Sequence, residues 1–242
     1  MNFITFNDFL NCVYVHPQEI KARPSPDEVL ESLMMIYAGE PPSLEGQVSE
    51  NNARKTVHGL KMIGAVVVKV VHRCKEARDS AELDLSSCSL LNLPSGVLHL
   101  MKHYNITRCN LSDNHLLSGL SPTFGSCFSG LTSLDLSFNN MSALPKEILL
   151  CKNLSSVDIS TNSFVVFPYL LLELSDLTEV KANNNFIADI DEESLESHES
   201  LEEIHLVGNP LNQSSHDKLS KILSLRIFLS PRNLEDWEDL SI

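Results

Sequence analysis

Apolar residues recur along most of the chain in one short pattern that returns six times. Each unit has an apolar residue, a variable residue, a second apolar residue, two variable residues, Asn or Cys, one more residue and a final apolar residue. Two apolar residues on either side of a variable one indicate a short strand with one buried face. Because one strand cannot cover that face alone, we predict that the units stack. The units are LDLSSCSL from Leu83, CNLSDNHL from Cys109, LDLSFNNM from Leu134, VDISTNSF from Val157, VKANNNFI from Val180 and IHLVGNPL from Ile204.

A polar marker near the end of each unit fixes the repeat length. The markers are Cys88, Asn114, Asn139, Asn162, Asn185 and Asn209, at steps of 26, 25, 23, 23 and 24 residues. An asparagine at the turn out of a strand can bond backbone groups that would otherwise be buried without partners. At these sites the sequence resembles the leucine-rich repeat family, whose xxLxLxxNxL motif it reproduces. The resemblance implies an α/β solenoid, with a curved parallel sheet on the concave side and short helices and loops on the convex side.

Helices are predicted after several strands. Leu-Pro or Phe-Pro at 93–94, 144–145 and 167–168 precedes a helical spacing of apolar residues, and proline is favoured in the first turn of a helix. After the last unit, residues 213–242 are predicted to form a C-terminal cap and an acidic tail. That cap should hold a helix over 217–223 and the strand-like sequence LRIFL.

The segment before the six repeats, which occupy residues 81–212, is predicted to contain an N-terminal cap. Residues 53–80 have the apolar spacing of an amphipathic helix, placed where it would cover the open end of the core. A membrane-binding or calmodulin-binding helix is the alternative, because the segment is basic. Residues 1–52 show no repeat, and we expect a poorly ordered extension with one short helix over 26–37.

The charge of the chain limits its partners. Its 242 residues include 18 Lys and Arg against 32 Asp and Glu, a net charge of −14 at pH 7. Only residues 51–80 are basic, with a net charge of +5. A strongly acidic chain repels nucleic acid, because binding depends on neutralising phosphates. The most apolar run, residues 62–71, is far shorter than the roughly 20 residues that cross a bilayer. We therefore expect a protein partner, no nucleic acid and no membrane span.

Two features indicate the compartment. The N-terminus lacks the basic start of a secretory signal, and Asp8 interrupts its apolar stretch. The six cysteines include no CxxC pair, and Cys88 and Cys109 occupy repeat positions where a thiol acts as a small apolar group. We expect free thiols and a cytoplasmic location, with the nucleus as the alternative.

Motifs of catalysis are missing from the sequence. GxGxxG, GxxxxGK[ST], HExxH and GxSxG do not occur. The nine histidines are dispersed, and His198 and His205 fall on different predicted elements. We therefore expect no enzyme activity, no cofactor and no metal site.

The concave face is the predicted binding surface, because residues between the apolar strand positions point away from the core. Its candidate contact residues are Asp84, Arg108, Asn110, Asp113, Asp135, Phe138, Asp158, Lys181 and His205. We call Asp84, Asp113, Asp135 and Asp158 the acidic track, and together with Phe138 they would suit a basic partner segment with an apolar anchor. The alternative is that these carboxylates only keep an open sheet soluble. We predict a non-catalytic intracellular interaction module, monomeric when free, with a regulatory subunit of an enzyme as the alternative.

Overall fold

The computed structural model describes residues 50–117 and 120–231. The predicted short helix over 26–37 and the acidic tail after residue 231 lie outside the described residues. Within them, the parallel solenoid predicted from the repeats is confirmed.

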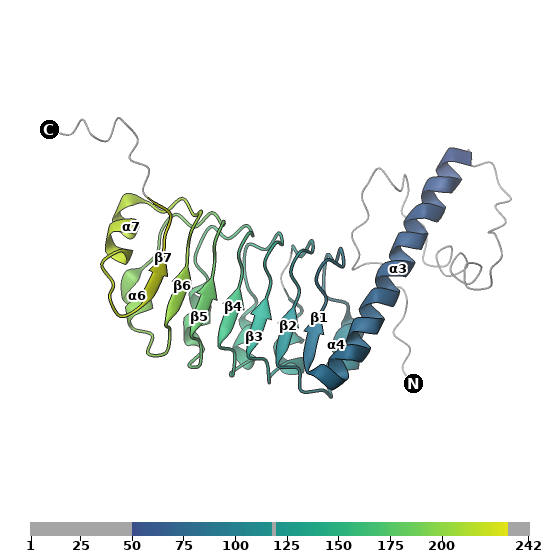
Figure 1. The fold of residues 1–242 in the computed structure, drawn as a ribbon, viewed down its shortest axis with the longest axis horizontal. Coiled ribbons are helices and arrows are strands. Elements are labelled where there is room, and N and C mark those ends of the chain that lie inside the picture. The colour runs from purple at the N-terminus through teal and green to yellow at the C-terminus, as the bar shows by residue number, and fades with distance from the viewer. Residues whose placement is uncertain (1–49, 118–119, 232–242) are drawn as a thin grey trace.

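One parallel sheet runs the length of the molecule, and its strands follow chain order without a crossover (Figure 1). Each strand has three residues, and in the first six strands the central one is the first apolar residue of a unit. The register therefore aligns equivalent positions of successive repeats, as Leu83 with Cys109 and Cys109 with Leu134. The strands are β1 Glu82–Asp84, β2 Arg108–Asn110, β3 Ser133–Asp135, β4 Ser156–Asp158, β5 Glu179–Lys181, β6 Glu203–His205 and β7 Arg226–Phe228.

The C-terminal segment extends the sheet beyond the six predicted repeats. β7 pairs with β6 in parallel, so that Ile227 lies beside Ile204 and Phe228 beside His205. The helix predicted over 217–223 is instead α7, Gln213–Leu219. It begins earlier because Asn212 accepts a hydrogen bond from the backbone N–H of Ser215 at 2.8 Å and caps the helix.

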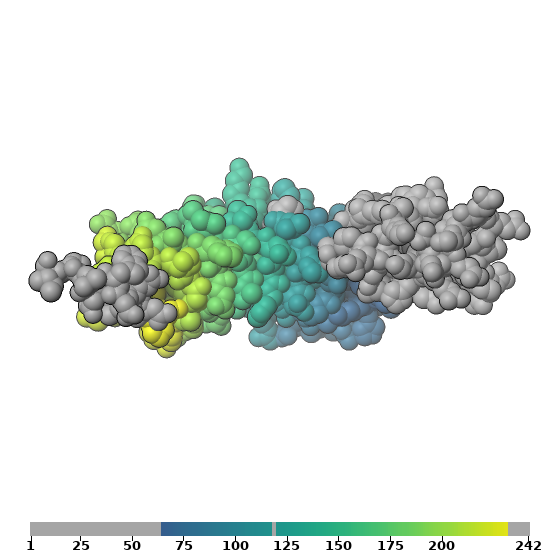
Figure 2. Space-filling view, turned by 90° about the horizontal axis from the view of Figure 1, so that it is seen from above, coloured from purple at the N-terminus to yellow at the C-terminus, as the bar shows by residue number. Residues whose placement is uncertain are grey.

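Short helices form the second layer of the fold, and Figure 2 shows the repeats following one another along the long axis of the molecule. After the proline-containing sequences only α4 is an α-helix; the other two segments are 3₁₀-helices, η1 and η2, in place of the predicted α-helices. Each is five residues long, and the tighter winding suits so short a connection. These elements are α4 Ser95–Met101, α5 Phe124–Cys127, η1 Lys146–Leu150, η2 Tyr169–Glu173 and α6 Glu192–Glu196.

A single apolar core lies between the sheet and the helices. The strand residues Leu83, Leu134 and Val157 are at most 1% exposed. In the longer second repeat, the rings of Phe124 and Phe128 meet edge to face with centroids 4.9 Å apart. The core therefore runs unbroken through repeats of different length.

The asparagine markers build a column of amides beside the core, because each follows its strand at the same position. In the third repeat, the Asn139 amide oxygen accepts the backbone N–H of Leu116 at 3.0 Å. Its amide nitrogen donates to the carbonyls of Leu111 and Leu136, both at 3.0 Å. Each such carbonyl belongs to the end of a strand, so the column satisfies backbone groups that the short strands leave unpaired.

The long helix α3, Glu50–Ser80, lies against β1 and α4 at the start of the solenoid (Figure 1). Its residues Val70, Cys74 and Ala77 are at most 1% exposed and join the common core. From the same helix, the Arg73 guanidinium donates to the backbone carbonyl of Ser86 at 2.5 Å. α3 thus covers apolar surface and also bonds the backbone of the first repeat.

Candidate interface on the open face of the sheet

The open face of the sheet is the face that points away from the core, and the strand register builds it in rows. The central residues of β1 to β6 are buried, whereas the residues on either side are exposed or half-buried. The candidate residues Asp84, Asn110, Asp135, Asp158, Lys181 and His205 follow one another in one row, which ends on Phe228. The predicted alternation therefore brings six of the nine candidate residues into one line across the sheet.

Asp135 and Asp158 lie side by side in this row, on β3 and β4. Each carboxylate accepts the backbone N–H two residues ahead, Asp135 from Ser137 at 2.9 Å and Asp158 from Ser160 at 2.8 Å. Burial raises the pKa of Asp158, and the neighbouring charge of Asp135 adds to the rise, so that together they outweigh the hydrogen bonds from Ser160. Two like charges are thus held next to each other on a rigid surface.

Phe138 and Asp113 stand at the edge of the open face, where the chain leaves the strand. Phe138 has a φ of 54° and Asp113 a φ of 53°, in the left-handed region. The Phe138 backbone N–H donates to the Ser160 carbonyl at 2.9 Å, which holds this turn against the next repeat. The ring of Phe138 is nevertheless 60% exposed. A large apolar side chain therefore stands uncovered in the turn that follows β3.

The N-terminal end of the acidic track is already engaged by α3. Asp84 is 3.7 Å from an Arg73 guanidinium nitrogen. Burial opposes ionisation of Asp84, but hydrogen bonds from Ser86 and the charge of Arg73 prevail and lower its pKa. The candidate Arg108 is likewise paired, with Glu82 on the neighbouring strand. Among the described residues, no Lys, Arg or His pairs with the other three carboxylates of the track, Asp113, Asp135 and Asp158.

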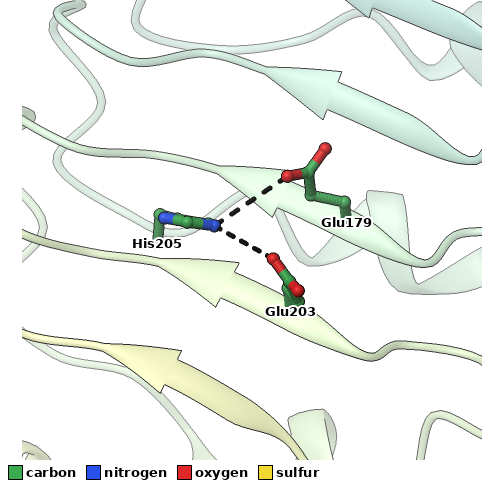
Figure 3. Close-up of side chains that lie close together, drawn as sticks. All are labelled: Glu179, Glu203 and His205. Carbon is green, nitrogen blue, oxygen red and sulfur yellow. Dashed lines mark ion pairs between the residues drawn. The ribbon is translucent and has the colours of Figure 1, made fainter.

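The C-terminal end of the open face carries a different group of charges, on β5 and β6 (Figure 3). Glu179 lies directly opposite Glu203 in the register. The His205 Nε2 atom is 3.4 Å from Glu203 Oε2 and 3.9 Å from Glu179 Oε1. The Lys181 ammonium is 2.9 Å from that same Glu179 oxygen. Lys181 and His205 were among the candidate residues predicted from the sequence. Glu179 and Glu203 were not, although both occupy the position just before the first apolar strand residue.

The described thiols are unsuited to nucleophilic or redox chemistry. Cys74, Cys88, Cys109, Cys127 and Cys151 are free, and all but Cys127 are buried. Burial raises the pKa of Cys74 and of Cys151 to about 11 and also raises that of Cys88. Cys88 therefore acts as a small core residue of the first repeat.

None of the described helices has the length and hydropathy of a membrane span.

Comparison with known proteins gives structural likenesses only. No protein-family model and no curated protein matches the sequence. A leucine-rich repeat protein of Leptospira interrogans is similar with a TM-score of 0.46 and 23% identity, over 56% of this chain and 39% of that one. The leucine-rich repeat domain of a Shigella effector has a TM-score of 0.43 and 23% identity, over 67% and 88%. The BIR2 ectodomain of Arabidopsis thaliana has a TM-score of 0.43 and 22% identity, over 53% and 67%.

The fold is identified from the strands and asparagines of this chain and does not rest on the comparisons. Its strands are parallel and in one register, and an asparagine follows the strand in five successive repeats, buried in four of them and half-buried at Asn209. The chain spans well under half the length of the Leptospira protein, so the likeness covers one part of that molecule. The parallel register and the asparagine column together give this protein the leucine-rich repeat fold.

Proposed function

We propose that the protein is a non-catalytic interaction module that binds a protein partner on the open, concave face of its sheet. The observation that carries the proposal is the exposed Phe138 in the turn after β3, together with Asp113, Asp135 and Asp158, which form no ion pair with a Lys, Arg or His of the described chain. A partner segment with Lys or Arg next to an apolar side chain would cover the ring and pair with the carboxylates. The setting we propose is intracellular, in the cytoplasm or the nucleus.

Several finer points belong to the same proposal. α3 serves as the N-terminal cap, and α7 with β7 serves as the C-terminal cap, which leaves the face between them for the partner. Residues 59–239 resemble leucine-rich repeat-containing protein 20, a small intracellular protein, in the sequences MIGAVVVKVV, LDLSSCSLLNLPSG, NPLN and LSP. The free protein is a monomer. A regulatory subunit that acts on an enzyme through the same face is the alternative function.

Charge reversal on the open face tests the proposal. The full chain carrying Asp135→Lys and Asp158→Lys serves as bait in a quantitative pull-down, beside the wild type. The matched control is Glu173→Lys with Asp176→Lys, because both of these acids are exposed and lie outside the sheet. The wild type and the control should capture the same partners, and the open-face variant should lose them.

The results separate the alternatives. Capture of an unchanged set of partners by the open-face variant would contradict binding at this surface and leave the carboxylates as solubilising groups. Loss of one enzyme present in stoichiometric amount would favour the regulatory subunit. Substrate turnover by the purified protein, abolished by a single substitution, would overturn the non-catalytic assignment.

A further inference from the structure

A histidine nitrogen without a hydrogen bond lies at the C-terminal end of the open face. The His205 Nε2 atom is buried and has no hydrogen-bond partner in the described part of the chain. The imidazole ring is held in place by the Phe228 ring, stacked on it at 4.2 Å with an angle of 11° between the planes. A buried nitrogen that makes no hydrogen bond is costly, so its surroundings should contain a group that completes it.

The surroundings of this nitrogen are carboxylates (Figure 3). His205 Nε2, a Glu203 oxygen and a Glu179 oxygen all lie within 4.8 Å of one another. The two glutamates are opposite each other on β5 and β6, and His205 follows two residues after Glu203 on the same face. Three strand-mounted donors therefore converge from two neighbouring repeats.

We propose that His205, Glu203 and Glu179 bind a divalent transition-metal ion of the Zn²⁺ class, with water completing its coordination. Zinc takes His nitrogen and carboxylate oxygen at about 2.0–2.2 Å, so two ligands on a tetrahedral ion lie roughly 3.3 Å apart. The distance from His205 to Glu203, 3.4 Å, is already close to this value, and the distance to Glu179 is 3.9 Å. Small side-chain rotations of Glu179 would close the remaining gap.

The free oxygens of the two carboxylates are held by other partners. Arg226 pairs with the Glu203 oxygen that faces away from the histidine. The Ser156 hydroxyl donates to Glu179 Oε2 at 2.8 Å, which leaves Oε1 toward His205. These contacts orient the ligand atoms and are the supporting interactions that tune metal sites.

Lys181 is the competitor of the metal ion. Its ammonium binds the same Glu179 oxygen that the ion would need, at 2.9 Å, and its side chain is 37% exposed. An incoming ion would displace this ammonium into solvent. The cluster therefore predicts an unusual response, in which removal of a charged neighbour strengthens binding.

The experiment is a Zn²⁺ titration of the metal-free full chain by calorimetry at neutral pH, with Co²⁺ in a parallel spectroscopic titration. We expect one Zn²⁺ per chain and the intense visible bands of four-coordinate Co²⁺. His205→Gln and Glu203→Gln should each weaken binding by about tenfold or more. Lys181→Met should strengthen it by on the order of tenfold, because it removes a like charge within contact distance of the ion. His103→Gln, which changes an exposed histidine just after α4, is the matched control and should bind as the wild type does.

Circular dichroism establishes that each variant is folded. The proposal is overturned if the wild type takes up no stoichiometric Zn²⁺, or if His205→Gln binds as tightly as the control. It is also overturned if Lys181→Met leaves the affinity unchanged, since Glu179 would then not be a ligand. Weak six-coordinate Co²⁺ bands would show adventitious binding by oxygen ligands and would refute the site. Should His205→Gln fail to fold, Glu203→Gln and the Co²⁺ spectrum decide the question.

Discussion

Replacement of Asn139 by alanine should weaken the fold more than any exposed substitution of the same size. The side chain is 7% exposed and makes hydrogen bonds in two directions, to its own repeat and to the preceding one. Its loss leaves the Leu116 N–H without the acceptor it now has at 3.0 Å. An orphaned buried N–H costs about 1–3 kcal/mol.

Loss of the bonds from Asn139 to the backbone carbonyls costs less, because each of these carbonyls also accepts a hydrogen bond from a neighbouring asparagine of the column. Leu111 also accepts from Asn114 at 2.9 Å, and Leu136 also accepts from Asn162 at 2.9 Å. Each carbonyl would thus keep one bond, and the loss of the second should cost about 0.5–1 kcal/mol. The total for Asn139→Ala is therefore about 2–5 kcal/mol in the free energy of unfolding, a large part of the 5–15 kcal/mol typical of a domain.

Urea unfolding followed by circular dichroism measures this change. Asn140→Ala is the matched control, because Asn140 is the next residue, has the same side chain and is exposed. We expect the control to change the free energy of unfolding by less than about 0.5 kcal/mol. If the two variants proved equally stable, the column would not be what satisfies the ends of the strands, and the reasoning would fail.

Two further substitutions test the electrostatics of the open face and the packing behind it. Asp158→Asn should stabilise the protein by about 0.2–1 kcal/mol at neutral pH, because it removes a negative charge directly across from Asp135. The new amide oxygen can still accept the backbone N–H two residues ahead, as Asn110 does in the same row. Since the folded-state pKa of Asp158 is raised, its protonated form favours folding. The gain should therefore vanish in urea unfolding below the ordinary aspartate pKa of 3.8, and a gain that persisted there would contradict this explanation. Gly125→Ala should lower the free energy of unfolding by about 1–3 kcal/mol in thermal melts, because a Cβ atom there would overlap the rigid backbone carbonyl of Glu147. Gly130→Ala, which meets only the end of a side chain, should cost clearly less.

The sequence predicts this fold well because each repeat shows both its buried and its exposed positions. Alternation around Leu134 and Val157 places their side chains in the core, and the step between polar markers sets the register of the strands. β7 was predicted only as a strand-like segment of the cap. It lacks the polar marker after the strand, and its place in the sheet comes from pairing with β6. A strand that forms because its neighbour offers free backbone groups needs no repeat pattern of its own, and its sequence therefore predicts it poorly.

The sequence predicts which residues lie on the open face, but not which of their charges form ion pairs. Register follows from the repeats, so the row from Asp84 to His205 could be derived before any coordinates. The conformations of long side chains could not, and they decide which charges are free. Glu203 and His205 are two residues apart on one strand and Glu179 is opposite Glu203, so the register places all three on one face. Which of their atoms approach each other depends on side-chain conformations that the spacing does not fix.

The irregular marker of the first repeat shows how one element compensates for another. Cys88 stands where later repeats have asparagine, and a thiol cannot donate two strong hydrogen bonds to backbone carbonyls. The Cys88 thiol donates only one long bond, of 3.4 Å, to the Ser86 carbonyl, and the Arg73 guanidinium adds a second donor to it at 2.5 Å. That carbonyl corresponds to the Ser112 carbonyl bonded by Asn114. Its charge also pairs with Asp84 at the start of the row. α3 therefore ends the hydrogen-bonded column and the acidic track at the same place, and the carboxylates of the track that form no ion pair within the described chain begin only beyond β1.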